Sequence, residues 1–289
     1  MKIAELEVKA SEILNSINEI NEITPEIIKQ IENTLPLYSQ FYLEYDIATG
    51  QFLTKNHSAL FMSYIKVFTV PILITNVSGV VANASGVLLS LSKNILVTNY
   101  HVYDEWRKQQ RNEETLFQIG SISLPVEEII LDCNTSLDLV TLEISDEIIN
   151  KVCQTSYKKL FIPQKWPVNS EVDEVVVASG FPGKLRSDST GFSNLYLGTI
   201  AEPITDATES KYIIPFDRTT WEKVLGVQDV NSLTSLGGFS GGPVFSNKNN
   251  EINLSGIIFE DGGNFFYGIR VIRSSLINRD GTINTTWGY

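Results

Sequence analysis

Histidine and cysteine are both scarce in this sequence, with two of each among 289 residues. His57 and His101 are not joined in a His-Glu-x-x-His motif, and neither Cys133 nor Cys153 lies in a cluster with histidine. A zinc site needs three or four such ligands at a recognisable spacing, and a disulfide framework needs more cysteines. We therefore expect no metal and no cofactor. We expect both cysteines to be buried small hydrophobic residues in a reducing cytosol, with a single disulfide between them as the alternative.

Basic residues are also in the minority, with 22 Lys and Arg against 34 Asp and Glu, for a net charge of −12. Such a surface repels phosphate backbones and anionic lipid. The sequence has no apolar run of about 18 residues, the length that spans a bilayer. Residues 1–10 alternate charged with aliphatic side chains and contain no signal-peptide core. These absences predict a cytoplasmic protein that binds neither nucleic acid nor membrane.

The first 60 residues have the pattern of a helical appendage. Residues 24–26 supply a cap, a proline at the first helical position and an early acid, which open a second helix that continues to Leu35. We expect the two helices to form a hairpin with an apolar seam along one side. This seam packs on its own domain, mediates homo-oligomerisation or docks a regulatory protein partner. The first helix is indicated by apolar residues at spacings of three and four: Ile3, Leu6, Ala10, Ile13, Ile17 and Ile20.

Residues 61–289 have the pattern of a mainly β domain. Short β-branched and aromatic runs are separated by Gly, Asn, Ser and Pro, as at 68–75, 86–91, 95–98 and 174–178. Many short strands with tight turns and few helical windows predict an antiparallel barrel or sandwich, and argue against a parallel α/β sheet. We therefore expect two domains, a helical appendage over residues 1–60 and a β domain over residues 61–289.

A serine surrounded by glycines is the first candidate for chemistry, in Gly238–Pro243 (GFSGGP). Glycines can take positive φ and let a substrate carbonyl approach the backbone closely. Such a turn exposes the Ser240 hydroxyl and aims backbone N–H groups at a developing oxyanion. A Gly-rich turn between two strands is the alternative explanation of the same residues.

A serine hydroxyl becomes a good nucleophile only when a base takes its proton, and histidine is the usual base. His57 lies in a polar stretch near the appendage, which favours a surface residue. His101 follows the apolar run from Ile95, so we expect it at the end of a strand at a barrel edge. His101 is therefore the candidate base, with a satisfied core histidine as the alternative.

A carboxylate must hold the imidazole in the right tautomer. Asp138 opens the predicted strand 138–144, in which the apolar run would draw the aspartate into the interior, where a charge needs a partner. Asp132 is its rival, and Asp104 follows His101 too closely to be more than a local cap. We favour Asp138 as the third member.

The order of these residues along the chain separates two hydrolase folds. The serine motif also matches the Gly-x-Ser-x-Gly elbow of α/β-hydrolases, in which the histidine follows the serine. Both histidines precede Ser240 here. The order His101, Asp138, Ser240 is that of the chymotrypsin fold.

Four ordered blocks resemble the peptidase domain of the high-temperature-requirement (Deg-type) serine proteases and their bacterial relatives, over residues 66–275. The blocks are Ser85–Ser90 with Val97–Val102 (VTNYHV), Asp132–Leu142, Gly180–Pro182 (GFP) and Gly238–Pro243. The resemblance implies a chymotrypsin-like fold of two six-stranded antiparallel β-barrels with the triad between them.

The resemblance also implies roles for particular residues. The backbone N–H groups of Gly238 and Ser240 would form the oxyanion hole, and protein or peptide chains would be the substrates. The wall of the specificity pocket would contain Thr234, Phe259, Glu260 and Asp261. The two acids would favour a basic side chain before the cleaved bond, although the glycines that follow them also fit a solvated turn.

Phe239 departs from the family pattern, which has asparagine or aspartate before the serine. Val102 replaces the cysteine of secreted trypsins, and no Ile-Val-Gly-Gly activation sequence is present, so activation by zymogen cleavage is not expected. Nor is a PDZ domain expected after the peptidase. Two hypotheses follow: an intracellular serine endopeptidase regulated by assembly or a partner, or an inactive peptidase-like binding or scaffold protein.

Overall fold

The computed structural model describes residues 43–46, 51–54, 61, 64–156, 158–189, 192–216, 237–248, 251–261 and 268–285. The chain divides into two compact units, residues 1–65 with 248–252, and residues 66–247 with 253–289. In the first unit, strand β1 (Leu43–Asp46) pairs antiparallel with β2 (Gln51–Thr54). The predicted helices over 3–35 and the boundary at residue 60 lie outside the described residues and stay predictions.

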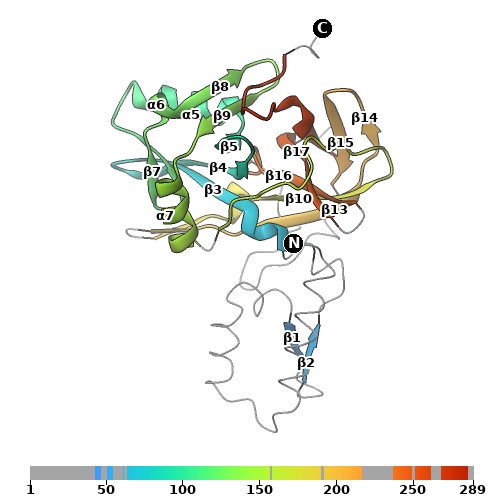
Figure 1. The fold of residues 1–289 in the computed structure, drawn as a ribbon. Coiled ribbons are helices and arrows are strands. Elements are labelled where there is room, and N and C mark those ends of the chain that lie inside the picture. The colour runs from blue at the N-terminus through green and yellow to red at the C-terminus, as the bar shows by residue number, and fades with distance from the viewer. Residues whose placement is uncertain are drawn as a thin grey trace. The chain divides into compact units, whose positions relative to one another are not determined.

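The second unit contains a first sheet of seven antiparallel strands (Figure 1). Alternate residues of its strands face one core, as the period of two in a strand requires. Val70, Ile72 and Ile74 of one strand pack there with Leu88 and Leu96 of the next two. The strands in order of pairing are β7 (Ile122–Leu124), β6 (Leu116–Ile119), β3 (Thr69–Asn76), β4 (Gly79–Ser90), β5 (Asn94–Thr98), β9 (Leu139–Glu143) and β8 (Ile130–Asn134).

A second sheet of seven strands follows in the chain and has a core of its own. Val176, Ile200, Ile214, Ile258 and Val271 meet in this core, each from a different strand. The strands in order of pairing are β13 (Gly198–Pro203), β10 (Val175–Gly180), β16 (Pro243–Lys248), β17 (Glu251–Asp261), β18 (Gly268–Arg273), β15 (Lys211–Pro215) and β14 (Asp206–Ala207). A separate hairpin joins β11 (Ser187–Ser189) to β12 (Phe192–Asn194).

Two curled antiparallel sheets, each with its own core, form the double β-barrel of the chymotrypsin fold. The predicted fold class is confirmed, with one difference in strand number. Within the described residues each sheet contains seven strands where six were expected, and one edge strand of each is very short: β7 has three residues and β14 has two.

The helices of the second unit were poorly anticipated. The run 95–101 was expected to be one strand ending at His101, but β5 ends at Thr98 and helix α5 (Tyr100–Gln110) follows. Val102 and Trp106, four residues apart, are buried on one face of this helix, and Trp106 Nε1 donates to the Thr115 carbonyl at 2.9 Å. This packing overrides the strand propensity of the tyrosine, histidine and valine at its start.

Further short elements complete the described fold. Helix α7 (Asp146–Ser156) buries Ile149 and Val152 beside the first sheet core. The remaining short helices are α6 (Val126–Ile129) and the 3-10 turns η1 (Lys66–Phe68), η2 (Gly183–Leu185) and η6 (Ser274–Leu276).

The two cysteines are both free thiols, and only one of them is partly buried. Cys153 lies half-buried on α7 against the first core, whereas Cys133 is exposed on β8. The prediction of two buried small hydrophobic residues is therefore wrong for Cys133. Its strand lies at the edge of the sheet, where alternate side chains face solvent.

Three phenylalanine rings connect the parts of the second unit. Phe68 precedes β3, Phe161 lies in the segment between the sheets, and Phe245 lies on β16. Their ring centroids are 5.1 Å apart for Phe68 and Phe161, 5.1 Å for Phe161 and Phe245, and 5.8 Å for Phe68 and Phe245. Tilted and edge-to-face pairs at these separations are favourable beyond their buried area.

Candidate active site

His101 and Asp138 are joined by two hydrogen bonds. The Nδ1 atom of the imidazole lies 2.7 Å from Asp138 Oδ2, and the His101 backbone N–H donates to Asp138 Oδ1 at 2.9 Å. One carboxylate thus binds both the ring and the main chain of the histidine. When Nδ1–H points at the carboxylate, Nε2 keeps its lone pair and can accept a proton.

The backbone of Asp138 is held in an unusual conformation. Its φ is +54°, in the left-handed region that aspartate tolerates better than most residues. Its carbonyl accepts from Tyr100 N–H at 3.1 Å and from Asn99 Nδ2 at 2.9 Å. Asp138 therefore satisfies the first N–H groups of α5, where a negative charge is also favoured by the helix dipole.

The imidazole remains accessible at this position. The His101 side chain is 52% exposed and that of Asp138 is 22% exposed. Asp138 is therefore half-buried, less than the expected interior position, because it sits at the turn before β9 and not within the strand. Its partner histidine can reach a group arriving from solvent.

Ser240 lies in a loop that hydrogen bonds tie to both sheets. Its carbonyl accepts from Ser85 N–H at 2.9 Å, on β4 of the first sheet. Gly241 N–H donates to the Ile258 carbonyl at 2.8 Å, and Ile258 N–H donates to the Gly242 carbonyl at 2.8 Å, on β17 of the second sheet. The main chain beside the serine is therefore fixed on both sides.

Two glycines of this loop are required by its geometry. Gly238 and Gly241 have φ of +96° and +83°, which L residues with a Cβ rarely adopt. A Cβ at Gly241 would overlap the Ser85 carbonyl and Thr98 Oγ1. The loop thus packs directly against the end of β5, three residues before His101.

The contact between the serine loop and the end of β5 also brings Asp138 close to that loop. Thr98 pairs with Val140 on β9, two residues after Asp138. The structure therefore joins His101 to Asp138 and sets the Ser240 loop against the strand end that carries them. Within the described part of the chain, no hydrogen bond joins the Ser240 hydroxyl to His101.

The two predicted oxyanion donors have no acceptor among the described residues, since neither Gly238 N–H nor Ser240 N–H donates a hydrogen bond there. The Gly237 carbonyl accepts from Gly183 N–H at 2.6 Å, and the Phe239 carbonyl accepts from Gly242 N–H at 2.9 Å. Because a trans peptide points its N–H opposite to its carbonyl, these bonds direct both N–H groups away from the protein atoms that bind the carbonyls.

Phe239 is a buried anchor of the loop. Its side chain is 1% exposed and packs in the second core with residues such as Val176 and Leu185. Its ring lies so close to Gly180 that a Cβ there would stand 2.8 Å from the ring. The departure from the family pattern at this position is therefore an apolar contact that holds the turn.

Ser85 and Asn83 on β4 have roles that the sequence did not indicate. Ser85 Oγ donates to the Gly238 carbonyl at 2.7 Å and accepts from Phe181 N–H at 2.8 Å. Asn83 Nδ2 donates to the Phe181 carbonyl at 2.8 Å. These bonds join the predicted Gly180–Pro182 turn to the serine loop. They span about a hundred residues or more of sequence, so no local pattern reveals them.

The rejected acids have other partners. Asp132 Oδ2 accepts from Ile283 N–H at 2.8 Å, and its Oδ1 accepts from Cys133 N–H at 2.7 Å. Asp104 does not cap a helix end, because it lies within α5 and forms an ion pair with Lys108 at 2.8 Å. Neither carboxylate forms a hydrogen bond with His101, which favours Asp138.

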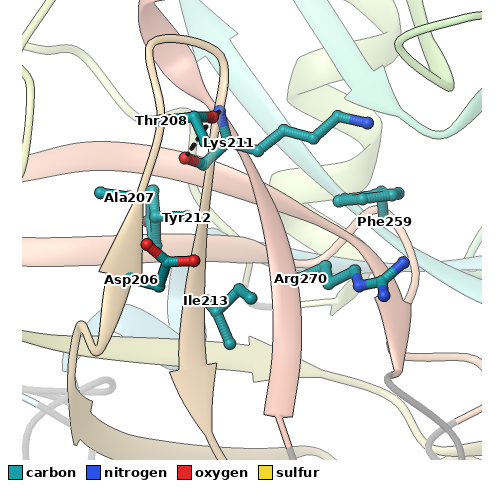
Figure 2. A pocket seen from close by; sticks show the side chains of 8 residues that line it. All are labelled: Asp206, Ala207, Thr208, Lys211, Tyr212, Ile213, Phe259 and Arg270. Carbon is teal, nitrogen blue, oxygen red and sulfur yellow. Dashed lines mark hydrogen bonds between the residues drawn. The ribbon is translucent and has the colours of Figure 1, made fainter. Parts of the chain in front are cut away.

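The predicted specificity residues are only partly within view. Thr234 lies outside the described residues, as does His57. Glu260 and Asp261 belong to β17, which pairs with β18 through both of them. The glycines of the alternative solvated turn lie outside the described residues. Phe259 lines a pocket on the second sheet (Figure 2).

No group of three or more possible metal ligands occurs among the described residues. None of the helices in the described ranges is long and apolar enough to cross a membrane.

No protein-family model matches the sequence, and no curated protein was found to be similar. Among solved structures, the chain is similar to a serine endoprotease from Yersinia pestis, at 16% identity and a TM-score of 0.43, over 73% of this chain and 60% of that one. It is also similar to a thermostable serine protease from an extremophilic microorganism, at 11% identity and a TM-score of 0.42, over 72% of this chain and 90% of that one. This chain therefore spans less than two thirds of the first structure.

Proposed function

We propose that this protein is a serine endopeptidase that cleaves peptide bonds in protein or peptide substrates. The observation that carries the proposal is the pair of hydrogen bonds from His101 to Asp138, at 2.7 and 2.9 Å, beside a glycine-rich serine loop. A helix cap alone would need only the bond to the backbone N–H. The second bond, to the ring, orients a base.

In the proposed reaction, Ser240 Oγ attacks the scissile carbonyl while His101 Nε2 takes the hydroxyl proton. Asp138 stabilises the imidazolium that forms. The carbonyl oxygen, now negative, accepts hydrogen bonds from Gly238 N–H and Ser240 N–H. His101 then gives the proton to the leaving amine, which breaks the peptide bond and leaves an acyl-enzyme. Water, deprotonated by His101, releases the acid product and restores the serine.

The site does not require a preformed bond between Ser240 and His101, since catalytic hydrogen bonds are often long in free enzymes and tighten when substrate binds. Assembly or a partner bound at residues 1–60 is part of the proposal, as is a cytoplasmic location. The second candidate is an inactive peptidase-like binding protein. The observation in its favour is that no hydrogen bond joins the Ser240 hydroxyl to His101 within the described residues.

A fluorophosphonate probe tests the proposal because it reacts only with an activated serine. The wild-type protein should be labelled and Ser240→Ala should not. Asp138→Asn should slow labelling by about a thousandfold or more, because the amide favours the wrong imidazole tautomer.

Asp132→Asn is the matched control. It makes the same chemical change at the rival aspartate, whose oxygens bind backbone N–H groups, and should label at the wild-type rate. Labelling that persists in Ser240→Ala, or equal effects of the two aspartate changes, would contradict the proposed mechanism. Absence of labelling with and without peptide or cell extract favours the inactive binding protein.

A further inference from the structure

A pocket of about 290 Å³ opens on the outer face of the second sheet (Figure 2). The cross-strand register explains why its side chains share one face. Ile213 on β15 pairs with Asp206 on β14 and with Arg270 on β18, and paired residues point to the same side of a sheet. Lys211 is two residues before Ile213 and shares that side. Tyr212, between them, faces the core and is 1% exposed.

A β-bulge supplies the aromatic wall of the pocket. Ile258 pairs with Val271 and Glu260 pairs with Arg270, which leaves Phe259 as the extra residue between two successive pairs. Bulges of this kind re-aim a side chain and are common beside active sites. The Lys211 ammonium lies 4.5 Å from the centre of the Phe259 ring, a cation–π contact that fixes the lysine beside the ring.

The pocket begins one residue away from the backbone that holds the serine loop. Ile258, the neighbour of Phe259, exchanges hydrogen bonds with Gly241 and Gly242. Gly241 follows Ser240 in the loop, Ile258 lies one hydrogen-bonded backbone away from Gly241, and Phe259 follows Ile258 on β17. These three steps place the Phe259 Cα roughly 10 Å from the Ser240 Cα. An extended peptide covers that distance in about three residues.

The charges in the pocket are uneven. Lys211 extends toward the Phe259 end, whereas Asp206 lies on β14 at the opposite end (Figure 2). Arg270 pairs across the strands with Glu260. Among the described residues, no carboxylate pairs with the Lys211 ammonium. A positive charge beside an apolar ring is thus presented to the pocket by a protein whose net charge is −12.

We propose that this pocket binds an acidic side chain of the substrate, two to four residues from the cleaved bond. The inference rests on the proposed function and adds a substrate class to it. The carboxylate would meet the Lys211 ammonium, and its methylene groups would pack on Phe259 and Ile213. A preference for acid here differs from the basic preference that the sequence suggested for Glu260 and Asp261, because it concerns another subsite.

The test uses internally quenched peptides that differ only in Glu, Gln or Lys at one position, two to four residues from the cleaved bond. The wild-type kcat/KM should favour Glu over Gln by about three- to tenfold at one of these positions. Lys211→Met keeps a long side chain against Phe259 and should remove most of that preference. Lys211→Glu should reverse it in favour of Lys. Lys93→Met removes a lysine that pairs with Glu143 on the first sheet and should change nothing.

Failure of this inference and failure of the proposed function give different results. The fluorophosphonate carries no peptide, so its labelling of Ser240 reports the function alone and should be equal in both Lys211 variants. Normal labelling with equal cleavage of Glu and Gln peptides overturns the pocket proposal only. Absent labelling, together with no binding of a fluorescent Glu peptide to Ser240→Ala, overturns both.

Discussion

At the scale of single residues, Lys158 carries a charge in an unfavourable place. Its ammonium donates to the Lys66 carbonyl at 3.0 Å and lies 5.1 Å from the centre of the Phe181 ring. Burial, with a smaller contribution from repulsion by Lys66, lowers the pKa of this amine to about 7. No carboxylate is among these contacts, so protonation is opposed wherever the protein is folded.

Lys158→Met should therefore stabilise the protein at pH 7 and below, by an amount on the order of 2 kcal/mol. In the unfolded chain the lysine keeps its proton up to about pH 10.5, so the folded state binds fewer protons between pH 7 and pH 10.5. Wild-type stability should rise with pH through this window, and the advantage of methionine should shrink. Urea unfolding at pH 6.5 and pH 9.5 measures both effects.

Lys151→Met is the control for this change. Lys151 is exposed on α7 and pairs with Glu147, so its loss should alter stability little at either pH. An advantage of Lys158→Met that is the same at both pH values would show that packing, and not charge, causes it.

Single residues also show how far sequence reasoning reaches: it selected His101 and Asp138, which are hydrogen-bonded, while their catalytic roles stay predictions. The scarcity of histidine left one plausible base, and the strand after Asp138 singled out the acid. The same reasoning misplaced the backbone, because the +54° φ of Asp138 and its capping of α5 depend on contacts between segments 37 residues apart. The bonds of the Ser85 hydroxyl to the serine loop and to Phe181 were not predicted for the same reason.

At the scale of elements, the serine loop is a turn pinned at several points. Its glycines permit the fold of the chain, and its carbonyls are held by Ser85 Oγ and Gly183 N–H. Phe239 is the one large side chain among residues 237–242, and it is buried in the second core. The orientation of the neighbouring peptide groups therefore depends on how well this ring fills its site.

Phe239→Ala should lower the free energy of unfolding by about 3 kcal/mol, because it leaves a cavity in the second core. It should also slow fluorophosphonate labelling well below the level that the loss of folded protein explains, since the loop loses its anchor. Chemical unfolding and labelling rates at low temperature measure the two effects.

Phe239→Leu fills most of the cavity and should restore both quantities in large part. Labelling at the wild-type rate in a folded Phe239→Ala protein would mean that the hydrogen bonds alone hold the loop, and that the ring matters only for stability.

Elements with strong local patterns were predictable and those set by distant contacts were not. The β-branched runs of β5, β9 and β10 identified these strands to within a few residues. Helix α5 was missed because Tyr100, His101 and Val102 favour strands, while its cap comes from Asp138, far along the chain. Phe259 was expected in a pocket wall, but its place in a bulge depends on the register with β18.

At the scale of the whole second unit, the proposed site is shared between two sheets. His101 and Asp138 belong to the first sheet and its adjoining helix, whereas the Ser240 loop leads into β16 of the second. The C-terminal residues return to the first sheet, where Thr141 Oγ1 donates to the Gly281 carbonyl at 2.8 Å. The order of His101, Asp138 and Ser240 along the chain predicted a fold of two barrels. It did not predict the contacts that hold the two barrels together.

Phe161 contacts residues of both sheets of the second unit. It is 4% exposed, its ring meets both Phe68 and Phe245, and its backbone exchanges hydrogen bonds with β4 through Leu88 and Ser90. Removing the ring leaves each sheet with its own core and leaves the Phe68–Phe245 pair, at 5.8 Å, without the third ring that contacts both. The alignment of Ser240 with His101 should then be lost before either sheet unfolds.

Phe161→Ala is therefore expected to reduce fluorophosphonate labelling at least tenfold at temperatures where circular dichroism shows native strand content, besides costing about 3 kcal/mol of stability. Phe117→Ala is the matched control, because Phe117 is equally buried but lies within the first core. It should cost similar stability and leave labelling of the folded protein nearly unchanged. Equal losses in the two variants would mean that labelling follows general stability, and that the aromatic cluster has no special part in aligning the sheets.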